Sequence, residues 1–168
     1  MIHMKRIYLI GFMGSGKSTV GLYLQHTFAQ TFIDTDQYIE QTKQKEISQI
    51  FADEGEDQFR QYEIQALQSL LDFDVIATGG GIVERKENYK TMHSNGVIIY
   101  LQTSFSEIMS RLKYDSSRPL WDQQITEREK LYERRHTMYK NIADHIIHTD
   151  GLHVEEIGKE IMGIMKQE

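Results

Sequence analysis

The sequence of 168 residues contains no cysteine and a single proline. The lack of cysteine excludes a disulfide framework, a thiolate zinc or iron–sulfur site and a cysteine nucleophile. No apolar run approaches the roughly 20 residues that a membrane-spanning helix needs. The apolar start, Ile7–Ile10, is too short for a signal peptide and no small-residue cleavage site follows it. A protein of the cytoplasm, with no membrane contact, is therefore expected.

Basic residues are outnumbered, with 19 Lys and Arg against 25 Asp and Glu and a net charge of −6. Nucleic-acid binders normally carry a basic face, so no nucleic-acid partner is expected. The hydrophobic share of 39% and the charged share of 26% are typical of a globular protein. Because no linker, repeat or low-complexity segment interrupts the chain, residues 1–168 are expected to form one domain.

Short apolar runs alternate with longer amphipathic stretches along the chain. The predicted strands are Ile7–Ile10, Thr31–Asp34, Val75–Thr78, Val97–Leu101 and His145–Thr149. The predicted helices are Lys17–Ala29, Gln58–Leu71, Ser104–Leu112, Ile125–Ala143 and Val154–Met165. This alternation indicates an α/β fold, a parallel sheet with helices on both faces. In such folds ligands bind beyond the carboxyl ends of the strands.

The clearest motif follows the first predicted strand. Residues Gly11–Thr19 match the pattern G-x-x-x-x-G-K-[ST] of a phosphate-binding P-loop. Its glycines let successive backbone N–H groups point inward as an anion nest, and the following helix adds its partial positive charge. Lys17 is then expected to reach the β- and γ-phosphates of a nucleotide, and Ser18 to bind Mg²⁺.

Two carboxylates, Asp34 and Asp36, stand at the end of the second predicted strand. One interpretation is that one of them serves Mg²⁺ and the other holds or deprotonates an acceptor hydroxyl. The alternative is that one carboxylate caps the helix that starts near Gln37. The nearby P-loop favours the functional interpretation.

Four weaker motifs follow. Arg60 and Glu63 share a helix face and can pair, whether in a site or on the surface. Gly79-Gly80-Gly81 either lets a ligand approach the backbone or forms a plain turn. Arg118-Pro119-Leu120 lies in a segment without periodicity that also holds Trp121, and Arg134-Arg135 lies on a predicted helix. Arginines in an acidic protein suit anionic ligands, although each alone is more often solvated.

Taken together and in this order, the motifs resemble the shikimate kinase family over nearly the whole chain. The resemblance implies the three-layer P-loop NTPase fold, with a five-stranded parallel sheet and a mobile lid at about residues 112–124. It implies an acceptor-binding region at about residues 34–62 and a monomer. The implied reaction is transfer of the ATP γ-phosphoryl group to the 3-hydroxyl of shikimate, in the pathway to chorismate and the aromatic amino acids, with Mg²⁺ as cofactor.

The same resemblance implies roles for particular residues. The implied catalytic residues are Lys17, Asp36 and Arg118. The implied ATP-binding residues are Gly14, Ser15, Gly16, Lys17, Ser18, Thr19, Arg111 and Arg118. The implied shikimate-binding residues are Asp36, Arg60, Gly79, Gly80, Gly81 and Arg135. Metal contacts are implied for Ser18 and, through water, for Asp34.

The chain departs from the family pattern at two positions. Thr137 replaces the usual proline of Arg-x-Pro-x-Tyr, and Trp121 stands where a leucine is common. The rival predictions are a gluconate kinase of the same fold, a nucleotide kinase and a non-catalytic nucleotide-binding domain. The first two would accept other substrates, and the third would bind nucleotide without turnover.

Overall fold

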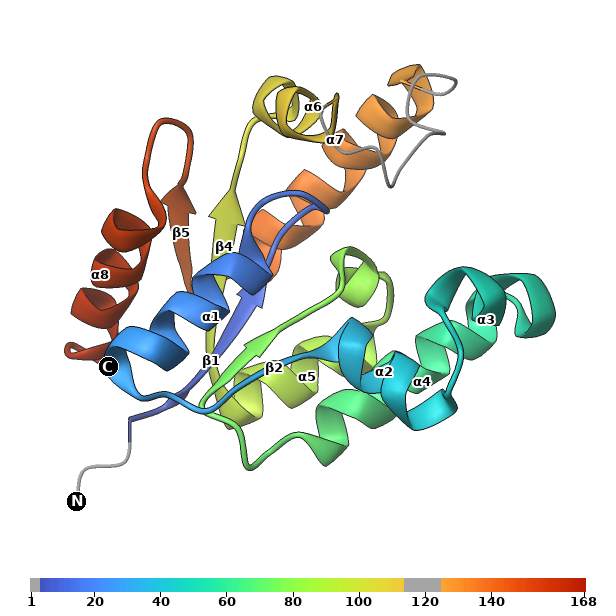
Figure 1. The fold of residues 1–168 in the computed structure, drawn as a ribbon, viewed down its shortest axis with the longest axis horizontal. Coiled ribbons are helices and arrows are strands. Elements are labelled where there is room, and N and C mark those ends of the chain that lie inside the picture. The colour runs from blue at the N-terminus through green and yellow to red at the C-terminus, as the bar shows by residue number, and fades with distance from the viewer. Residues whose placement is uncertain (1–3, 114–124) are drawn as a thin grey trace.

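A five-stranded sheet lies at the centre of the computed structural model, which describes residues 4–113 and 125–168 (Figure 1). All strand pairings are parallel, and the order is β2-β3-β1-β4-β5. The strands are β1 (Arg6–Ile10), β2 (Phe32–Asp34), β3 (Val75–Ala77), β4 (Gly96–Gln102) and β5 (His145–His148). The parallel α/β architecture and all five predicted strands are therefore confirmed, whereas the predicted lid lies mostly outside the described residues.

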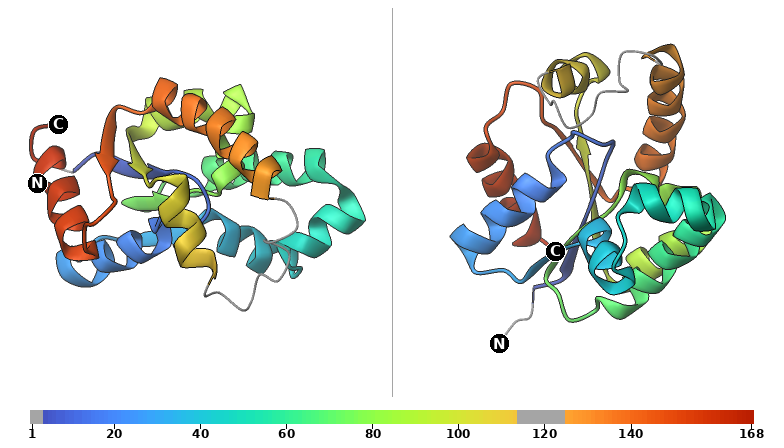
Figure 2. Two further views of the ribbon diagram at one scale, coloured as in Figure 1. Left: turned by 90° about the horizontal axis from the view of Figure 1, so that it is seen from above. Right: turned by 45° about the vertical axis from the view of Figure 1, so that its right-hand side comes forward.

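Helices cover both faces of this sheet, as the view from above shows (Figure 2). The helices α1 and α8 lie on one face, and α4, α5 and α7 lie on the other. The helical segments are α1 (Lys17–Phe28), α2 (Thr35–Lys43), α3 (Ile47–Glu54), α4 (Glu56–Ser69), η1 (Gly80–Glu84, a 3₁₀ helix), α5 (Lys86–Asn95), α6 (Phe105–Lys113), α7 (Ile125–Ile142) and α8 (Val154–Met165). None of these helices is long and apolar enough to cross a membrane.

The core follows from the two-residue period of the strands. Along β1, Ile7 and Leu9 join the cluster under α1 and α8, whereas Tyr8 and Ile10 join the cluster on the opposite face. All four side chains are fully buried. A strand covered on both faces needs apolar residues at every position, which explains why the predicted strands showed no polar alternation.

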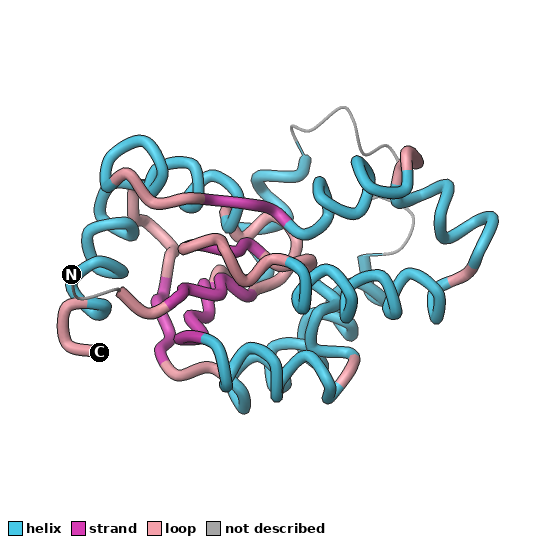
Figure 3. The backbone as a smooth tube through the Cα atoms, turned by 90° about the horizontal axis from the view of Figure 1, so that it is seen from below, coloured by secondary structure: helices cyan, strands magenta, loops and turns pink. Residues whose placement is uncertain are grey.

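Helices α2 and α3 extend beyond the β2 edge of the sheet, and α4 runs from them onto the sheet face (Figures 1 and 3). They include most of the predicted acceptor-binding region, residues 34–62. Because parallel strands end at one edge, the segments that follow β1, β2 and β3 converge there.

Candidate active site

The phosphate-binding loop joins β1 to α1 and lines a pocket of about 360 Å³. Gly14 and Gly16 adopt φ angles of 81° and 91°, a left-handed backbone that favours glycine. This backbone turns the chain sharply into the N-terminus of α1, where the partial positive charge of the helix attracts anions. The pocket is lined by Met13, Gly14, Gly16, Lys17, Ser18, Thr19, Asp34, Asp36, Gln37, Thr78, Gly79 and Gly80.

Lys17 lies beneath this loop and is 8% exposed. Its Nζ atom donates hydrogen bonds to the carbonyl oxygens of Gly11 and Phe12, at 2.7 and 3.0 Å, and lies 3.4 Å from Oγ of Ser15. Ser15 is itself buried and does not line the pocket. The loop therefore holds the ammonium group in place at the pocket wall.

Asp34 fulfils one of the two roles that its sequence position suggested, that of a helix cap. One carboxylate oxygen caps α2, accepting hydrogen bonds from the backbone N–H groups of Asp36 and Gln37 at 2.9 and 3.2 Å. The other oxygen accepts a hydrogen bond from the Ser18 hydroxyl across the pocket. The two side chains predicted to contact a metal ion, Ser18 and Asp34, are thus in direct contact with each other.

Asp36 is half-buried and lines the same pocket, with its Oδ1 atom shielded from solvent. Its Oδ1 atom has no hydrogen-bond partner among the described residues. Burial raises the pKa of Asp36 to about 7, and the negative charges of Asp34 and Glu63 add to this effect. A Cβ atom at Gly79 would lie 2.6 Å from this Oδ1 and 3.0 Å from Oε2 of Glu63. Glycine at position 79 is therefore required by the two carboxylates that approach it.

Arg60 and Glu63 form a buried ion pair, with Nη1 and Oε1 2.5 Å apart. The side chains are 6% and 0% exposed, so the alternative of a surface ion pair is wrong. A Cβ atom at Gly81 would lie 2.2 Å from Nη1 of Arg60. Gly81 therefore makes room for the guanidinium group, and it does not line the pocket itself.

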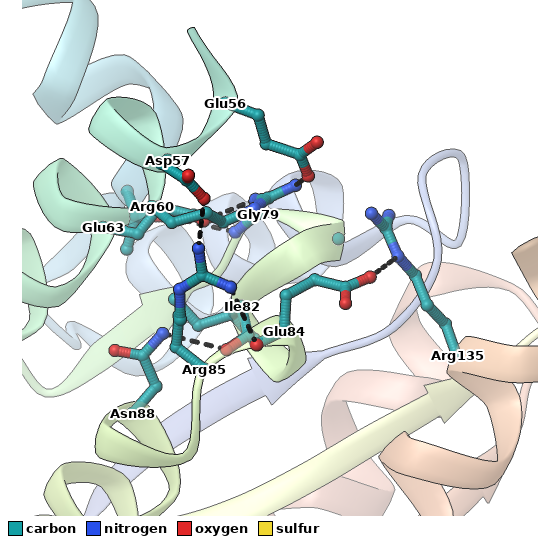
Figure 4. A network of polar contacts seen from close by, with 12 residues as sticks. Glu56, Asp57, Arg60, Glu63, Gly79, Ile82, Glu84, Arg85, Asn88 and Arg135 are labelled. Carbon is teal, nitrogen blue, oxygen red and sulfur yellow. Dashed lines mark hydrogen bonds and ion pairs between the residues drawn. The ribbon is translucent and has the colours of Figure 1, made fainter.

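The structure separates the two neighbouring arginines of α7. Arg135 is buried, and its Nη1 lies 3.5 Å from the position of a Cβ atom at Gly80. Arg134 is exposed and pairs with Glu84 of η1. The hydroxyl of Tyr139 also donates a hydrogen bond of 2.5 Å to the Gly80 carbonyl. Arg135 is thus the arginine of this pair that meets the glycine segment, and Figure 4 shows the surrounding network.

Thr137 causes no break in α7, which runs without interruption from Ile125 to Ile142. The Thr137 hydroxyl donates to the carbonyl of Glu133 one turn earlier, at 3.3 Å. Arg135 and Tyr139, on either side of it, therefore occupy one regular helix face. The chain at Thr137 is therefore ordinary α-helix.

Two further arginines contact the phosphate-binding loop. Arg111, expected near the nucleotide, donates from Nη1 to the carbonyl of Gly14 at 3.1 Å. Arg128, which the motifs did not indicate, lies with Nη1 3.7 Å from the sulfur of Met13. No spacing rule connects it to a P-loop 115 residues away. Arg118 and Trp121 lie outside the described residues.

Comparisons with known proteins agree on one family. The family model described as shikimate kinase matches residues 13–166. A shikimate kinase of Bacillus cereus (strain G9842) is 42% identical over 166 residues, which are 98% of each chain. A shikimate kinase of Persephonella marina is 40% identical over 162 residues, covering 95% of this chain and 98% of that one.

Solved structures give the same result. The shikimate kinase from Acinetobacter baumannii in complex with shikimate has a TM-score of 0.88 and 31% identity, covering 98% of this chain and 94% of that one. The enzyme from Aquifex aeolicus has a TM-score of 0.82 and 33% identity, covering 96% of each chain. A gluconokinase from Sinorhizobium meliloti has a TM-score of 0.58 at 14% identity, with 98% and 93% of the chains covered, and this likeness shows the fold alone.

Proposed function

This chain belongs to the shikimate kinase family, and we propose that it transfers the γ-phosphoryl group of ATP to the 3-hydroxyl of shikimate. The products are shikimate 3-phosphate and ADP. One observation carries the assignment of the site: a phosphate-binding loop and Asp36, whose Oδ1 atom is buried, line the same pocket. Two buried arginines, Arg60 and Arg135, lie against the glycine segment beside this pocket. The loop can bind a nucleotide, Asp36 a hydroxyl group and the two arginines a carboxylate, all in one region.

On the nucleotide side, the backbone N–H groups of the loop and Lys17 bind the phosphates. The residues concerned are Gly14, Ser15, Gly16, Lys17, Ser18 and Thr19. The contact of Arg111 with the Gly14 carbonyl supports a place for Arg111 next to the nucleotide. Phosphoryl transfer needs positioning and charge neutralisation more than covalent chemistry. Lys17 serves both needs because the loop already fixes its ammonium group.

The oxygen atoms of Ser18 and Asp34 fit Mg²⁺ that enters with ATP, with Asp34 acting through water. The described residues contain no group of three or more His, Cys, Asp or Glu side chains suited to a metal. This agrees with Mg²⁺, which keeps several waters and is held by one or two side chains plus substrate phosphates. When bound, Mg²⁺ neutralises charge on the β- and γ-phosphates.

Asp36 acts as the general base. Its Oδ1 atom is buried and has no hydrogen-bond partner among the described residues, so it is able to accept a hydrogen bond from the acceptor hydroxyl. The hydroxyl oxygen forms a bond to the γ-phosphorus while the bond to the bridging oxygen of ADP breaks. The hydroxyl proton passes to Asp36.

Arg60 and Arg135 bind the substrate carboxylate, because planar guanidinium groups match carboxylates with paired hydrogen bonds. The glycines at positions 79, 80 and 81 let the substrate and these side chains approach the backbone. Arg118, on the lid at about residues 112–124, contacts the transferred phosphate, and lid closure keeps water from hydrolysing ATP. One domain over residues 1–168, a monomeric state and a cytoplasmic location remain predictions from the sequence.

An acceptor comparison tests this function. ADP release is measured with Mg-ATP and shikimate, with Mg-ATP and gluconate, and with Mg-ATP alone. We expect turnover with shikimate only. Turnover with gluconate instead would overturn the assignment of shikimate as the acceptor. Equal ADP release without any acceptor would mean that the protein is an NTPase.

A further inference from the structure

Glu84, the last residue of η1, contacts both arginines of α7. Its Oε1 accepts hydrogen bonds from Nη2 of Arg134 at 2.8 Å and from Nε of Arg135 at 3.0 Å. Its Oε2 accepts a third, from Nη1 of Arg134 at 3.0 Å. The Glu84 and Arg135 side chains are 15% and 8% exposed, so solvent screens this contact little. None of the motifs in the sequence indicated Glu84.

The contact is made with one particular edge of Arg135. Glu84 takes the Nε position, and Figure 4 shows the terminal nitrogens directed away from Glu84. The Nη1 atom lies beside Gly80, which lines the pocket. Two parallel hydrogen bonds to a carboxylate need a guanidinium edge in a fixed orientation. Glu84 therefore holds Arg135 without using the terminal edge that an acid ligand would meet.

A carboxylate at this place would by itself repel an acid ligand. Arg134 neutralises this negative charge, because its two terminal nitrogens pair with both oxygens of Glu84. Burial alone would raise the pKa of Glu84, but hydrogen bonds from Arg134 and Arg135 lower it, so the ion pair persists at neutral pH. The paired charges leave Arg135 as the net positive group of the three.

We propose that Glu84 is a positioning residue for recognition of the substrate carboxylate, and that Arg134 cancels its charge. Glu84 acts through Arg135 and does not touch the substrate. This inference rests on the proposed function, since it assumes an acid substrate bound by Arg135. The contact of Tyr139 with Gly80 already ties α7 to η1. Loss of Glu84 should therefore change the orientation of Arg135 more than the docking of the helix.

The test compares shikimate with its uncharged carboxamide as acceptors. In Glu84→Ala we expect kcat/KM for shikimate to fall about tenfold, through KM, because misplacement of a binding group weakens oriented contacts. The value for the carboxamide should change less than about twofold, so discrimination between the two acceptors falls. A purely structural role for Glu84 would lower both values alike, and that result would overturn the proposal.

A second experiment combines Glu84→Ala with Arg135→Ala in a double-mutant cycle. Once Arg135 is absent, Glu84→Ala should cause no further loss of discrimination. An undiminished loss in that background would contradict the proposal. Arg134→Gln should raise the shikimate KM about threefold at low salt and less at high salt, because salt screens the exposed charge. A lower KM in this variant would contradict the charge-cancelling role.

Asp57→Asn is the matched control. Asp57 pairs with Arg85 at 2.7 Å beside the same network and is almost fully exposed, so its loss removes one negative charge without touching Arg135. It should leave discrimination unchanged. If Glu84→Ala does not fold, Glu84→Gln replaces it. We then expect a smaller fall in discrimination between the two acceptors, and unchanged discrimination would contradict the proposal. Wild-type turnover of shikimate is measured first: its absence overturns the proposed function, whereas its presence with unchanged discrimination in the variant overturns the Glu84 proposal alone.

Discussion

At the scale of single residues, the site places buried carboxylates close together. Asp36 and Glu63 both approach Gly79, and one oxygen of each has no hydrogen-bond partner among the described residues. A buried, unpaired carboxylate lowers the stability of the folded state. Residues at functional positions often lower stability in this way, because activity and stability place different demands on them. The arrangement predicts opposite effects on activity and stability when Asp36 is neutralised.

Asp36→Asn should reduce kcat at least about 100-fold, because a general base typically contributes 10²–10⁴ in rate. The same variant should unfold at a higher temperature than the wild type at pH 8, because a buried charge with like-charged neighbours is removed. Steady-state kinetics and thermal melts measure both effects. A variant that keeps most of its activity, or that melts well below the wild type, would contradict the role and the environment given to Asp36.

Gly81→Ala should displace the Arg60 guanidinium, since a Cβ atom would lie 2.2 Å from its Nη1 and 2.5 Å from its Cζ. We expect an increase of about tenfold or more in the shikimate KM with the ATP KM unchanged, and a loss of about 1–3 kcal/mol in the free energy of unfolding. Gly163→Ala is the matched control, because nothing lies within 4 Å of a Cβ there. An unchanged shikimate KM in Gly81→Ala would contradict this packing.

The sequence motifs predicted several members of the site, but they did not indicate Glu84. The P-loop and the pair Arg60 and Glu63 are local patterns, in which spacing along the chain fixes which groups meet. Glu84 meets Arg134 across 50 residues of sequence, and only the docking of α7 on η1 brings them together. Single-sequence patterns carry no information on such contacts between distant elements.

At the scale of elements, α7 connects the site to the sheet through a cluster of rings. His136 stacks on Tyr132, with centroids 5.8 Å apart and planes 6° apart, and its Nδ1 lies 2.8 Å from the hydroxyl of Tyr100 on β4. Tyr139 packs against the Tyr100 ring at 5.0 Å. Arg135 projects from the same helix, so the ring cluster helps to fix the position of the arginine.

His136 makes the stability of this packing dependent on pH. Burial lowers the pKa of His136 below its usual 6.5, and the charge of Lys140 lowers it further. A group whose pKa is depressed in the folded state contributes stability that is present above its unfolded pKa and lost as pH falls. Protonation of Asp36, whose pKa lies at about 7, acts in the opposite direction over this range, so the prediction concerns the difference between two proteins. From pH 7.5 to pH 5.5 the free energy of unfolding of the wild type should fall relative to that of His136→Gln. Urea unfolding measures this, and equal pH slopes in the two proteins would contradict the prediction.

Sequence periodicity predicted some helices better than others. The helix α1 shows a clear apolar stripe and was predicted, whereas α3 and α5 were not. The reason is their small buried face: α3 buries only Ile50, and α5 buries Met92 together with the polar Asn88. Both helices are also shorter than the windows of about 11–18 residues over which helical periodicity is normally recognised.

At the scale of the whole molecule, one end of the parallel sheet forms the site and the other end stabilises the fold. The pocket lies at the carboxyl ends of the strands, whereas Arg6 closes the opposite end. Its guanidinium group donates to the carbonyl oxygens of Phe73 at 2.8 Å and Asn95 at 2.9 Å, and also to that of Leu71. These carbonyls belong to the segments that lead into β3 and β4, so Arg6 ties three parts of the chain together.

Arg6→Ala should therefore lower the free energy of unfolding by about 1–3 kcal/mol, because carbonyl groups lose a charged donor. Both KM values should stay within about twofold of the wild type, since the substitution lies at the far edge of the sheet. Urea unfolding and steady-state kinetics provide the measurements. Unchanged stability, or a large change in the shikimate KM, would contradict this division between the two ends.

The topology also explains why a short chain can assemble this site. The strand order places β1 between β3 and β4, so the P-loop after β1 lies next to the glycine segment after β3. The segment that begins at Asp34 follows β2 at the same edge, and α7 returns from late in the chain to add Arg135. Three of these parts line the pocket, and Arg135 lies beside it, next to Gly80.

The most direct measurement is phosphorus NMR of the reaction of the wild-type protein with Mg-ATP and shikimate. Transfer to a carbon-bound hydroxyl predicts a new phosphomonoester signal that is coupled to the proton at C3 of shikimate and grows in step with ADP. Growth of ADP and inorganic phosphate alone would contradict the account, because it would mean transfer to water rather than to the acid held by Arg60 and Arg135.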